Sequence, residues 1–382
     1  MGDWDVSCAI CGVIFIPEDV YIESEAELFS EGKSRESERD RSYSYDGSKV
    51  TKADCEWLSD NDALGLWPQH GQPEATNTFM TGRFEPGGYG SILLEARALS
   101  SHLQDQEDSM IAYRSVLGGL LTVFPFHTAC YKLLGRVISG RINTTVDEEN
   151  LYAAFVRLSD EYSTWHLDID YGSPCPRDNR SWITYRGHEV DAPSAVLLRP
   201  TNIRCPQLLV KNPIDTANIS THLVNQQFLP EVLASSSVLQ DPFDRLPHEI
   251  RQHLLELLSN RDIAAVRTAS YPMHATIPSK AVWKRLIAAH MPWLWEMDAV
   301  ISRGAYRELN LSRTIRELEN WTTFGDDKTD TFSLALANRR RIWSICEIIA
   351  DEYDKVTDEC KVATTKEWVD MGDGCFELQI KP

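Results

Sequence analysis

Apolar residues recur at helical intervals in two segments of the first half of the chain. The first segment, residues 125–140, places five of them on one face: Cys130, Leu133, Leu134, Val137 and Ile138. Gly140 supplies a stop signal, and residues 147–162 predict a second helix whose acidic start suits a helix N-terminus. Further upstream, residues 1–22 have a strand-rich pattern, and the segment Tyr89–Leu99 predicts the start of a strand. We therefore expect residues 1–233 to form a mixed α+β domain.

From Leu246 onwards the pattern is almost wholly helical. Pro247 fits the first position of a helix, where its missing N–H costs nothing, and Glu249 falls in the first turn. The apolar stripe of this helix consists of Ile250, Leu254, Leu257 and Leu258. Leu255 lies off the stripe, so we expect this helix to have apolar surface on more than one side.

Two further helices are predicted after the first. Asn260 can cap the second, which carries Ile263 and Val266, and Ser279 can cap the third. The shared face of the third helix contains Trp283, Leu286, Ile287 and His290. Because about fifty residues make a thin core, we expect the three helices to need an external surface to complete their burial. This physical need points to a binding partner.

The rest of the chain contains two more segments with helical spacing, residues 307–321 (RELNLSRTIRELENW) and 333–354 (SLALANRRRIWSICEIIADEYD). We expect them to pack against the three preceding helices as a helical C-terminal region. The predicted order of domains is a mixed domain (1–233), a linker (234–240), a three-helix unit (241–290) and the helical C-terminal region (291–382).

The charge balance argues against two classes of partner. The 382 residues carry a net charge of −19, whereas nucleic acids and anionic lipids both require a basic surface. The longest nearly apolar run, Val6–Ile16, is too short to span a bilayer, and the start MGDWD lacks the basic residues of a secretion signal. We therefore expect no nucleic-acid or membrane partner, and nine reduced cysteines in the cytoplasm or nucleus.

Two short motifs carry candidate metal ligands. In CAICG, Cys8 and Cys11 have the spacing of a metal knuckle, and Gly12 readily takes the positive φ that such a turn can require. In PFHTACYKLL, His127 and Cys130 lie at the start of a predicted helix, whose backbone amides favour a thiolate. Together the pairs predict a Cys3His site for a structural Zn²⁺ ion. The alternatives are ordinary buried cysteines or a redox pair, and the strand-like GVIFIP after the first motif disfavours the latter.

The segment HLDIDYG, residues 166–172, alternates polar and apolar side chains. His166, Asp168 and Asp170 are possible metal ligands by residue type. The alternation predicts instead a half-buried strand with one solvated face.

The helical pattern after Asp241 resembles the F-box, the small module that binds the Skp adaptor of cullin–RING ubiquitin ligases. The residues that carry the resemblance are Leu246-Pro247-x-Glu249-Ile250, Leu257-Leu258, Arg261-Asp262-Ile263, Val266-Arg267 and Val282-Trp283-x-x-Leu286. The resemblance implies that six residues either face the adaptor or support the face that does so: Leu246, Pro247, Ile250, Leu254, Leu258 and Ile263. The chain departs from the family between Arg267 and Lys280, where RTASYPMHATIPSK replaces a Val-Cys-Lys-like stretch and a tryptophan.

The knuckle followed by a helix resembles a treble-clef zinc unit, and its presence together with an F-box resembles a group of fungal F-box proteins. These resemblances imply a non-enzymatic substrate-receptor subunit of a Skp–cullin–F-box ubiquitin ligase, which recruits a protein client. One alternative is a zinc-dependent hydrolase in the N-terminal half, which requires an open coordination position. The other is an interaction scaffold, in which the stripe of Ile250, Leu254 and Leu258 is buried within the chain.

Overall fold

The computed structural model divides into two compact units. Residues 1–215 and 324–382 form the sheet unit, and residues 216–323 form the helical unit. The residues that the structure describes are 6–15, 51–68, 76–87, 90–94, 109–113, 122–140, 146–159, 166–171, 182–185, 188–191, 211–214, 241–304, 307, 311–323, 331–363, 365–370 and 376–381. The sheet unit is therefore assembled from both ends of the chain.

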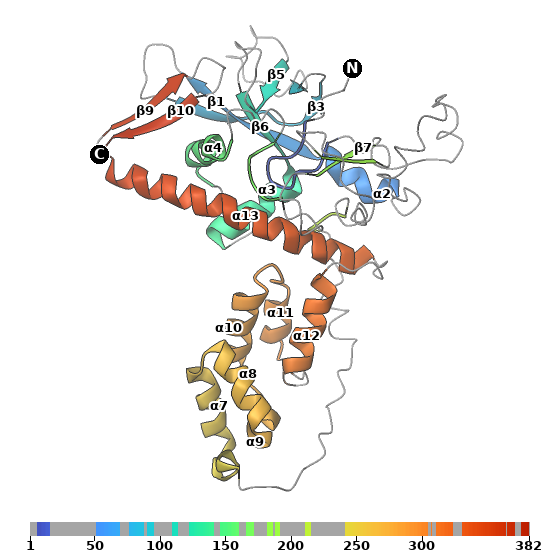
Figure 1. Ribbon diagram of the computed structural model, residues 1–382, viewed down its shortest axis with the longest axis vertical. Helices are drawn as coiled ribbons and strands as arrows, with labels where there is room; N and C mark the ends of the chain where they lie inside the picture. Colours follow the sequence, from blue (N-terminus) through green and yellow to red (C-terminus); the bar gives the residue numbers. More distant parts are fainter. Residues whose placement is uncertain are drawn as a thin grey trace. The chain divides into compact units, whose positions relative to one another are not determined.

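A six-stranded sheet with the order β2-β1-β6-β5-β4-β3 forms the centre of the sheet unit (Figure 1). Its strands are β1 (Asn61–Pro68), β2 (Thr76–Met80), β3 (Phe84–Pro86), β4 (Ser91–Leu94), β5 (Ser109–Ala112) and β6 (Thr122–His127). All neighbouring strands are antiparallel except β5 and β6, which are parallel. Every residue of β6 is buried, as expected for a strand that is covered on both faces.

Two helices of the sheet unit, α3 and α4, end or begin at residues that favour helix termini. The helices of this unit are α2 (Lys52–Cys55), the short 3-10 helix η5 (Glu56–Ser59), α3 (Thr128–Ser139), α4 (Glu148–Arg157) and α13 (Thr331–Val362). Gly140 ends α3 with φ of +73°. The carboxylate of Asp147 caps α4 by accepting the Asn150 N–H at 3.0 Å, and α4 packs on β1 and β2.

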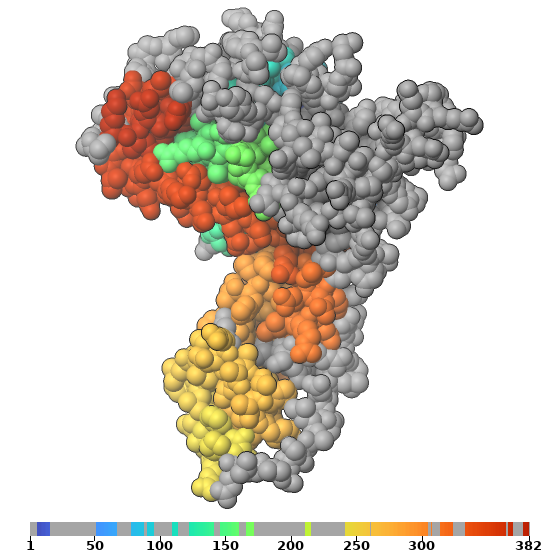
Figure 2. All heavy atoms as spheres, viewed as in Figure 1, coloured from blue at the N-terminus to red at the C-terminus, as the bar shows by residue number. Residues whose placement is uncertain are grey.

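The C-terminal segment completes the sheet unit. Helix α13 packs along α3 and α4, and Figure 2 shows the C-terminal residues (red) against α4 (green). Arg157 of α4 makes a bidentate ion pair with Glu359 of α13, with N···O distances of 3.1 and 2.7 Å. Strands β9 (Thr365–Asp370) and β10 (Phe376–Lys381) then form a hairpin that contacts α4. A second hairpin consists of β7 (Trp182–Tyr185) and β8 (His188–Asp191).

The described part of the helical unit consists of short helices around a small apolar core. They are η8 (Pro242–Arg245), α7 (His248–Leu257), α8 (Asn260–Ala269), α9 (Tyr271–Ala275), α10 (Lys280–His290), α11 (Met297–Ser302) and α12 (Leu311–Thr322). Their fully buried apolar residues include Leu255, Met273, Trp283, Leu294, Met297 and Ile301. The Ser259 and Ser279 hydroxyls cap α8 and α10 by accepting backbone N–H groups.

The prediction of a mixed α+β fold is confirmed, but two parts of the predicted domain organisation are wrong. Residues 291–382 are neither wholly helical nor one region, because α11 and α12 belong to the helical unit while residues 324–382 belong to the sheet unit and end in a hairpin. The boundaries lie at 215/216 and 323/324, instead of 233 and 290. The predicted linker, residues 234–240, lies outside the described residues.

Several local predictions shift by a few residues. Ser259 caps α8 instead of Asn260, and Pro247 is the N-cap of α7 instead of its first residue. Residues 125–127 belong to β6, and residues 166–171 form an irregular segment, not a strand. Within the part of the chain that the structure describes, no helix is both long enough and apolar enough to cross a bilayer.

Candidate metal centre and exposed helix face

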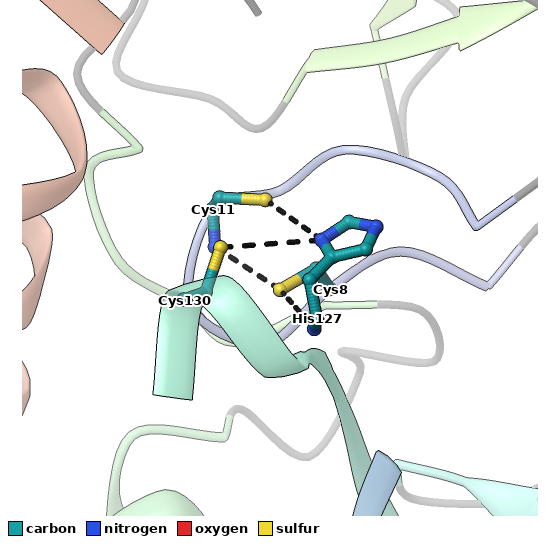
Figure 3. Close-up of side chains that lie close together, drawn as sticks. All are labelled: Cys8, Cys11, His127 and Cys130. Carbon is teal, nitrogen blue, oxygen red and sulfur yellow. Dashed lines mark hydrogen bonds between the residues drawn. The ribbon is translucent and has the colours of Figure 1, made fainter. Parts of the chain in front are cut away.

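The four predicted ligands converge in the sheet unit (Figure 3). The ligand atoms of Cys8, Cys11, His127 and Cys130 all lie within 4.8 Å of one another, and each residue is at most 1% exposed. They come from two pieces of chain separated by more than a hundred residues. Three sulfurs and one imidazole nitrogen can hold a metal ion at this position.

The first two ligands lie on a tight knuckle. The Gly12 N–H donates to the Cys8 carbonyl at 2.9 Å, and Gly12 has φ of +74°, the positive value that its sequence context predicts. The Ala9 N–H donates to the Pro125 carbonyl of β6 at 2.8 Å. This bond attaches the knuckle to the strand that carries the other two ligands.

The other two ligands lie where β6 passes into α3. His127 is the last residue of β6 and the N-cap of α3, and Cys130 lies in the first turn of the helix. The His127 N–H points to the Cys8 sulfur at 3.4 Å, as does the Cys11 N–H from the knuckle. Two backbone amides therefore favour a thiolate at Cys8.

The orientation of the His127 ring suits a metal ligand. Its Nε2 lies 3.3 Å from the Ile14 carbonyl, which can only accept a hydrogen bond. Nδ1 faces the sulfurs, at 3.4 Å from Cys11 and 4.0 Å from Cys130. The rings of Phe15 and Trp57 flank the imidazole, with centroid distances of 4.6 and 4.8 Å. A proton held on Nε2 leaves the Nδ1 lone pair available for an ion.

The pKa values of the clustered ligands are shifted in different directions. Burial acts to raise the pKa of Cys8, but hydrogen bonds from Cys11 and Cys130 and the charge of His127 bring that pKa well below its ordinary value. Burial also acts to lower the pKa of His127, yet the cysteine charges raise it to about 10. The Cys130 pKa is raised well above its ordinary value, first by burial. Metal binding would therefore displace protons from this cluster.

Residues that the sequence analysis did not identify surround the knuckle. The Tyr113 hydroxyl donates to the Ser7 carbonyl at 2.7 Å, and the Tyr171 hydroxyl donates to the Ala9 carbonyl at 3.0 Å. Arg341 of α13 donates through Nη1 to the Cys11 carbonyl at 2.9 Å. Burial lowers the pKa of Arg341, and the nearby cysteine charges counteract this effect. The segment of His166, Asp168 and Asp170 does not join the cluster, although its Tyr171 supports the knuckle.

A second feature is the exposed apolar face of α7 in the helical unit. Ile250 is 48% exposed and Leu257 is 70% exposed, and the two residues lie on one face because they are seven positions apart. Pro247 is also exposed, and the flanking residues Leu246, Leu254 and Leu258 are half-buried. Figure 2 shows α7 (yellow) at the surface of its unit.

The opposite side of α7 carries the core residue. Leu255 is fully buried, although it falls outside the predicted stripe, and Ile263 of α8 is buried as a support. The predicted stripe is therefore exposed at Ile250 and Leu257 and half-buried at Leu254 and Leu258. The scaffold alternative requires Ile250 to be buried as well, and Ile250 is 48% exposed.

Polar side chains fix α7 in place from the neighbouring helices. Arg285 of α10 donates to the carbonyls of Glu256, Leu255 and Leu258 at 2.6, 3.1 and 2.7 Å. It thereby satisfies carbonyl groups at the helix C-terminus that have no partner within the helix. Arg285 thereby attaches the C-terminal end of α7, which carries Leu257, to α10.

The segment that departs from the F-box pattern is held by a buried arginine. Arg267 of α8 donates to the carbonyls of Met273 and Thr276 at 3.1 and 2.7 Å, and burial lowers its pKa to about 10. Tyr271 and Ile277 of this segment are exposed. The segment is thus ordered and adds apolar surface to the helical unit.

Comparison of the chain with protein-family models, with curated proteins and with solved structures found no significant match.

Proposed function

We propose that this chain is a substrate-receptor subunit of a Skp–cullin–F-box ubiquitin ligase. Residues 241–290 bind the Skp adaptor, and the sheet unit or the C-terminal helices contact a protein client. The supporting observation is the exposed face of α7, where Ile250 and Leu257 stand at the surface of a small helical unit. Apolar side chains of this size gain about 1.5–3 kcal/mol each when a partner buries them fully.

The contribution of Leu257 can be tested separately from general surface hydrophobicity. With 70% of its surface available, Leu257→Ala should cost about 1–2 kcal/mol of adaptor binding, or roughly a 5- to 30-fold weaker complex. Leu257→Asp should abolish detectable capture of the adaptor. Val362→Asp is the matched control, because Val362 is 77% exposed and lies on α13 of the sheet unit.

The assay is a pull-down of purified Skp adaptor with the full chain, repeated with Leu246 and Pro247 replaced. The proposal predicts that the unaltered chain and the Val362→Asp variant capture the adaptor. The Leu257→Asp variant and the variant with Leu246 and Pro247 replaced should not. Capture that survives Leu257→Asp and the Leu246 and Pro247 replacements, or no capture by the folded unaltered chain, would refute it.

We further propose that the Cys3His cluster holds a structural Zn²⁺ ion. The donor set fits, because thiolates and imidazole are preferred zinc ligands, and a tetrahedral ion spaces its ligand atoms about 3.5–4 Å apart. In the structure these atoms lie within 4.8 Å of one another. Bound there, the ion would link the knuckle to the β6–α3 junction. The ion supplies rigidity, whereas the ubiquitin-transfer chemistry belongs to other subunits.

The arrangement of the same four ligands argues against the zinc-hydrolase alternative. A catalytic zinc ion keeps an open coordination position, whereas here four protein ligands converge and each is at most 1% exposed. Metal analysis of single substitutions at Cys8, Cys11, His127 and Cys130 separates the two roles. Loss of metal together with loss of folding supports a structural ion, while retained folding with a lost hydrolytic activity supports catalysis.

A further inference from the structure

Arg341 is a buried cation next to the candidate metal centre. It is 9% exposed, and its Nη1 donates to two backbone carbonyls, those of Cys11 and Tyr171, at 2.9 Å each. Its Nε donates to the Asn338 side-chain oxygen at 3.1 Å. Its Nη2 is buried and has no hydrogen-bond partner among the described residues.

The surroundings of Arg341 do not otherwise neutralise it. A buried charge is strongly unfavourable unless an opposite charge compensates it. No carboxylate of the described residues forms an ion pair with Arg341, and both partners of Nη1 are neutral carbonyl groups. The negative charges that act most strongly on Arg341 among the described residues are those of Cys11, Cys130 and Cys8.

We propose that Arg341 is the fixed counter-cation of the metal centre. The inference rests on the proposed Cys3His ion: three thiolates, one neutral imidazole and a divalent ion carry a net charge of −1, which one guanidinium neutralises. Arg341 belongs to the C-terminal part of the sheet unit, whereas all four ligands belong to the N-terminal part. Metal binding and the packing of α13 therefore stabilise each other, although the residues of the helical unit separate α13 from the ligands in the sequence.

Two substitutions distinguish charge from hydrogen bonding. Arg341→Lys keeps the positive charge but loses the planar fork, whereas Arg341→Gln keeps a donor and loses the charge. A counter-cation predicts that the lysine variant holds the metal nearly as well as the unaltered chain and that the glutamine variant does not. A residue that only anchors the Cys11 carbonyl predicts the opposite order or an equal loss.

The experiment measures the Zn²⁺ dissociation constant of the full chain by chelator competition. Arg341→Gln should weaken binding about 10- to 100-fold, the usual effect of an outer-shell change, and Arg341→Lys by about threefold at most. The Co²⁺ absorption spectrum should keep the form of a Cys3His site in all variants. The control is Arg339→Gln, because Arg339 is also buried on α13 but donates to the Pro213 carbonyl, and it should leave affinity unchanged within about twofold.

The outcomes separate this inference from the metal centre itself. No zinc bound by the unaltered chain would overturn the metal centre, whereas normal affinity in Arg341→Gln, or equal losses in the Arg339 and Arg341 variants, would overturn only the counter-cation. If Arg341→Gln alone does not fold, the counter-cation predicts that adding Cys130→His restores folding, because a Cys2His2 site is neutral and needs no counter-charge. A double variant that does not fold, while Cys130→His alone does, would contradict the proposal.

Discussion

Replacing Gly12 by alanine should destabilise the sheet unit through two separable effects. The residue has φ of +74°, where an alanine is strained by about 1–2 kcal/mol. The added methyl group would also lie 2.9 Å from Cδ1 and 3.0 Å from Cγ of the Tyr171 ring. Such overpacking costs typically about 1–3 kcal/mol, so we expect a total loss of about 2–5 kcal/mol.

Gly140 provides a matched control within the same unit. Its φ is +73°, but an added methyl group there meets nothing within 4 Å. Gly140→Ala should therefore cost only the backbone strain of about 1–2 kcal/mol. Because both substitutions change the unfolded chain in the same way, the difference between them isolates the packing of the knuckle on Tyr171.

The assay is chemical denaturation of the full chain in zinc-containing buffer, followed by circular dichroism, with metal content measured on the same samples. We expect Gly12→Ala to lower the denaturation midpoint more than Gly140→Ala does. The difference in the free energy of unfolding should be about 1–3 kcal/mol. Equal losses in the two variants would refute the idea that Tyr171 supports the knuckle.

Three further predictions concern the metal, the sheet and the helical unit. Zinc affinity should rise with pH between about 6 and 9, by roughly tenfold per pH unit for each proton released, because the His127 pKa of about 10 means that its proton must leave; a pH-independent dissociation constant would contradict this. Gly65→Val should lower the thermal midpoint, since the added side chain would overlap the Phe79 ring; an unchanged midpoint in circular dichroism would contradict this. Arg285→Ala should raise hydrogen exchange at the end of α7 by removing its contacts to the terminal carbonyls, and unaltered exchange would count against that role.

The metal ligands could be predicted from the sequence because each pair has a local signature. The C-x-x-C-G knuckle and the His-x-x-Cys pair at a helix start require only short-range spacing and a turn residue. Their convergence depends on the Ala9–Pro125 backbone bond and on the β6–α3 junction. No periodicity records such a contact between distant segments, so the pairing followed from chemical type alone.

Other features could not be predicted because amphipathicity identifies an apolar face without its partner. Helix α13 was expected to pack against the three preceding helices, but it belongs to the sheet unit, where it packs on α3 and α4. In α7 two residues of the stripe with the best helical period, Ile250 and Leu257, are exposed, while Leu255 fills the core, because both sides of this helix are apolar. Arg341 stands in the run NRRRIW, where arginines are normally solvated, so its burial had no signal in the sequence.

Hydrogen exchange of the full chain with and without the Skp adaptor tests the central claim most directly, because it shows whether a complex forms and where it protects the chain. Adaptor binding through the exposed face of α7 predicts protection concentrated at residues 246–258 of the helical unit, with the cluster around Cys8 and His127 unchanged. No protection at a saturating adaptor concentration, or protection confined to the sheet unit, would contradict it.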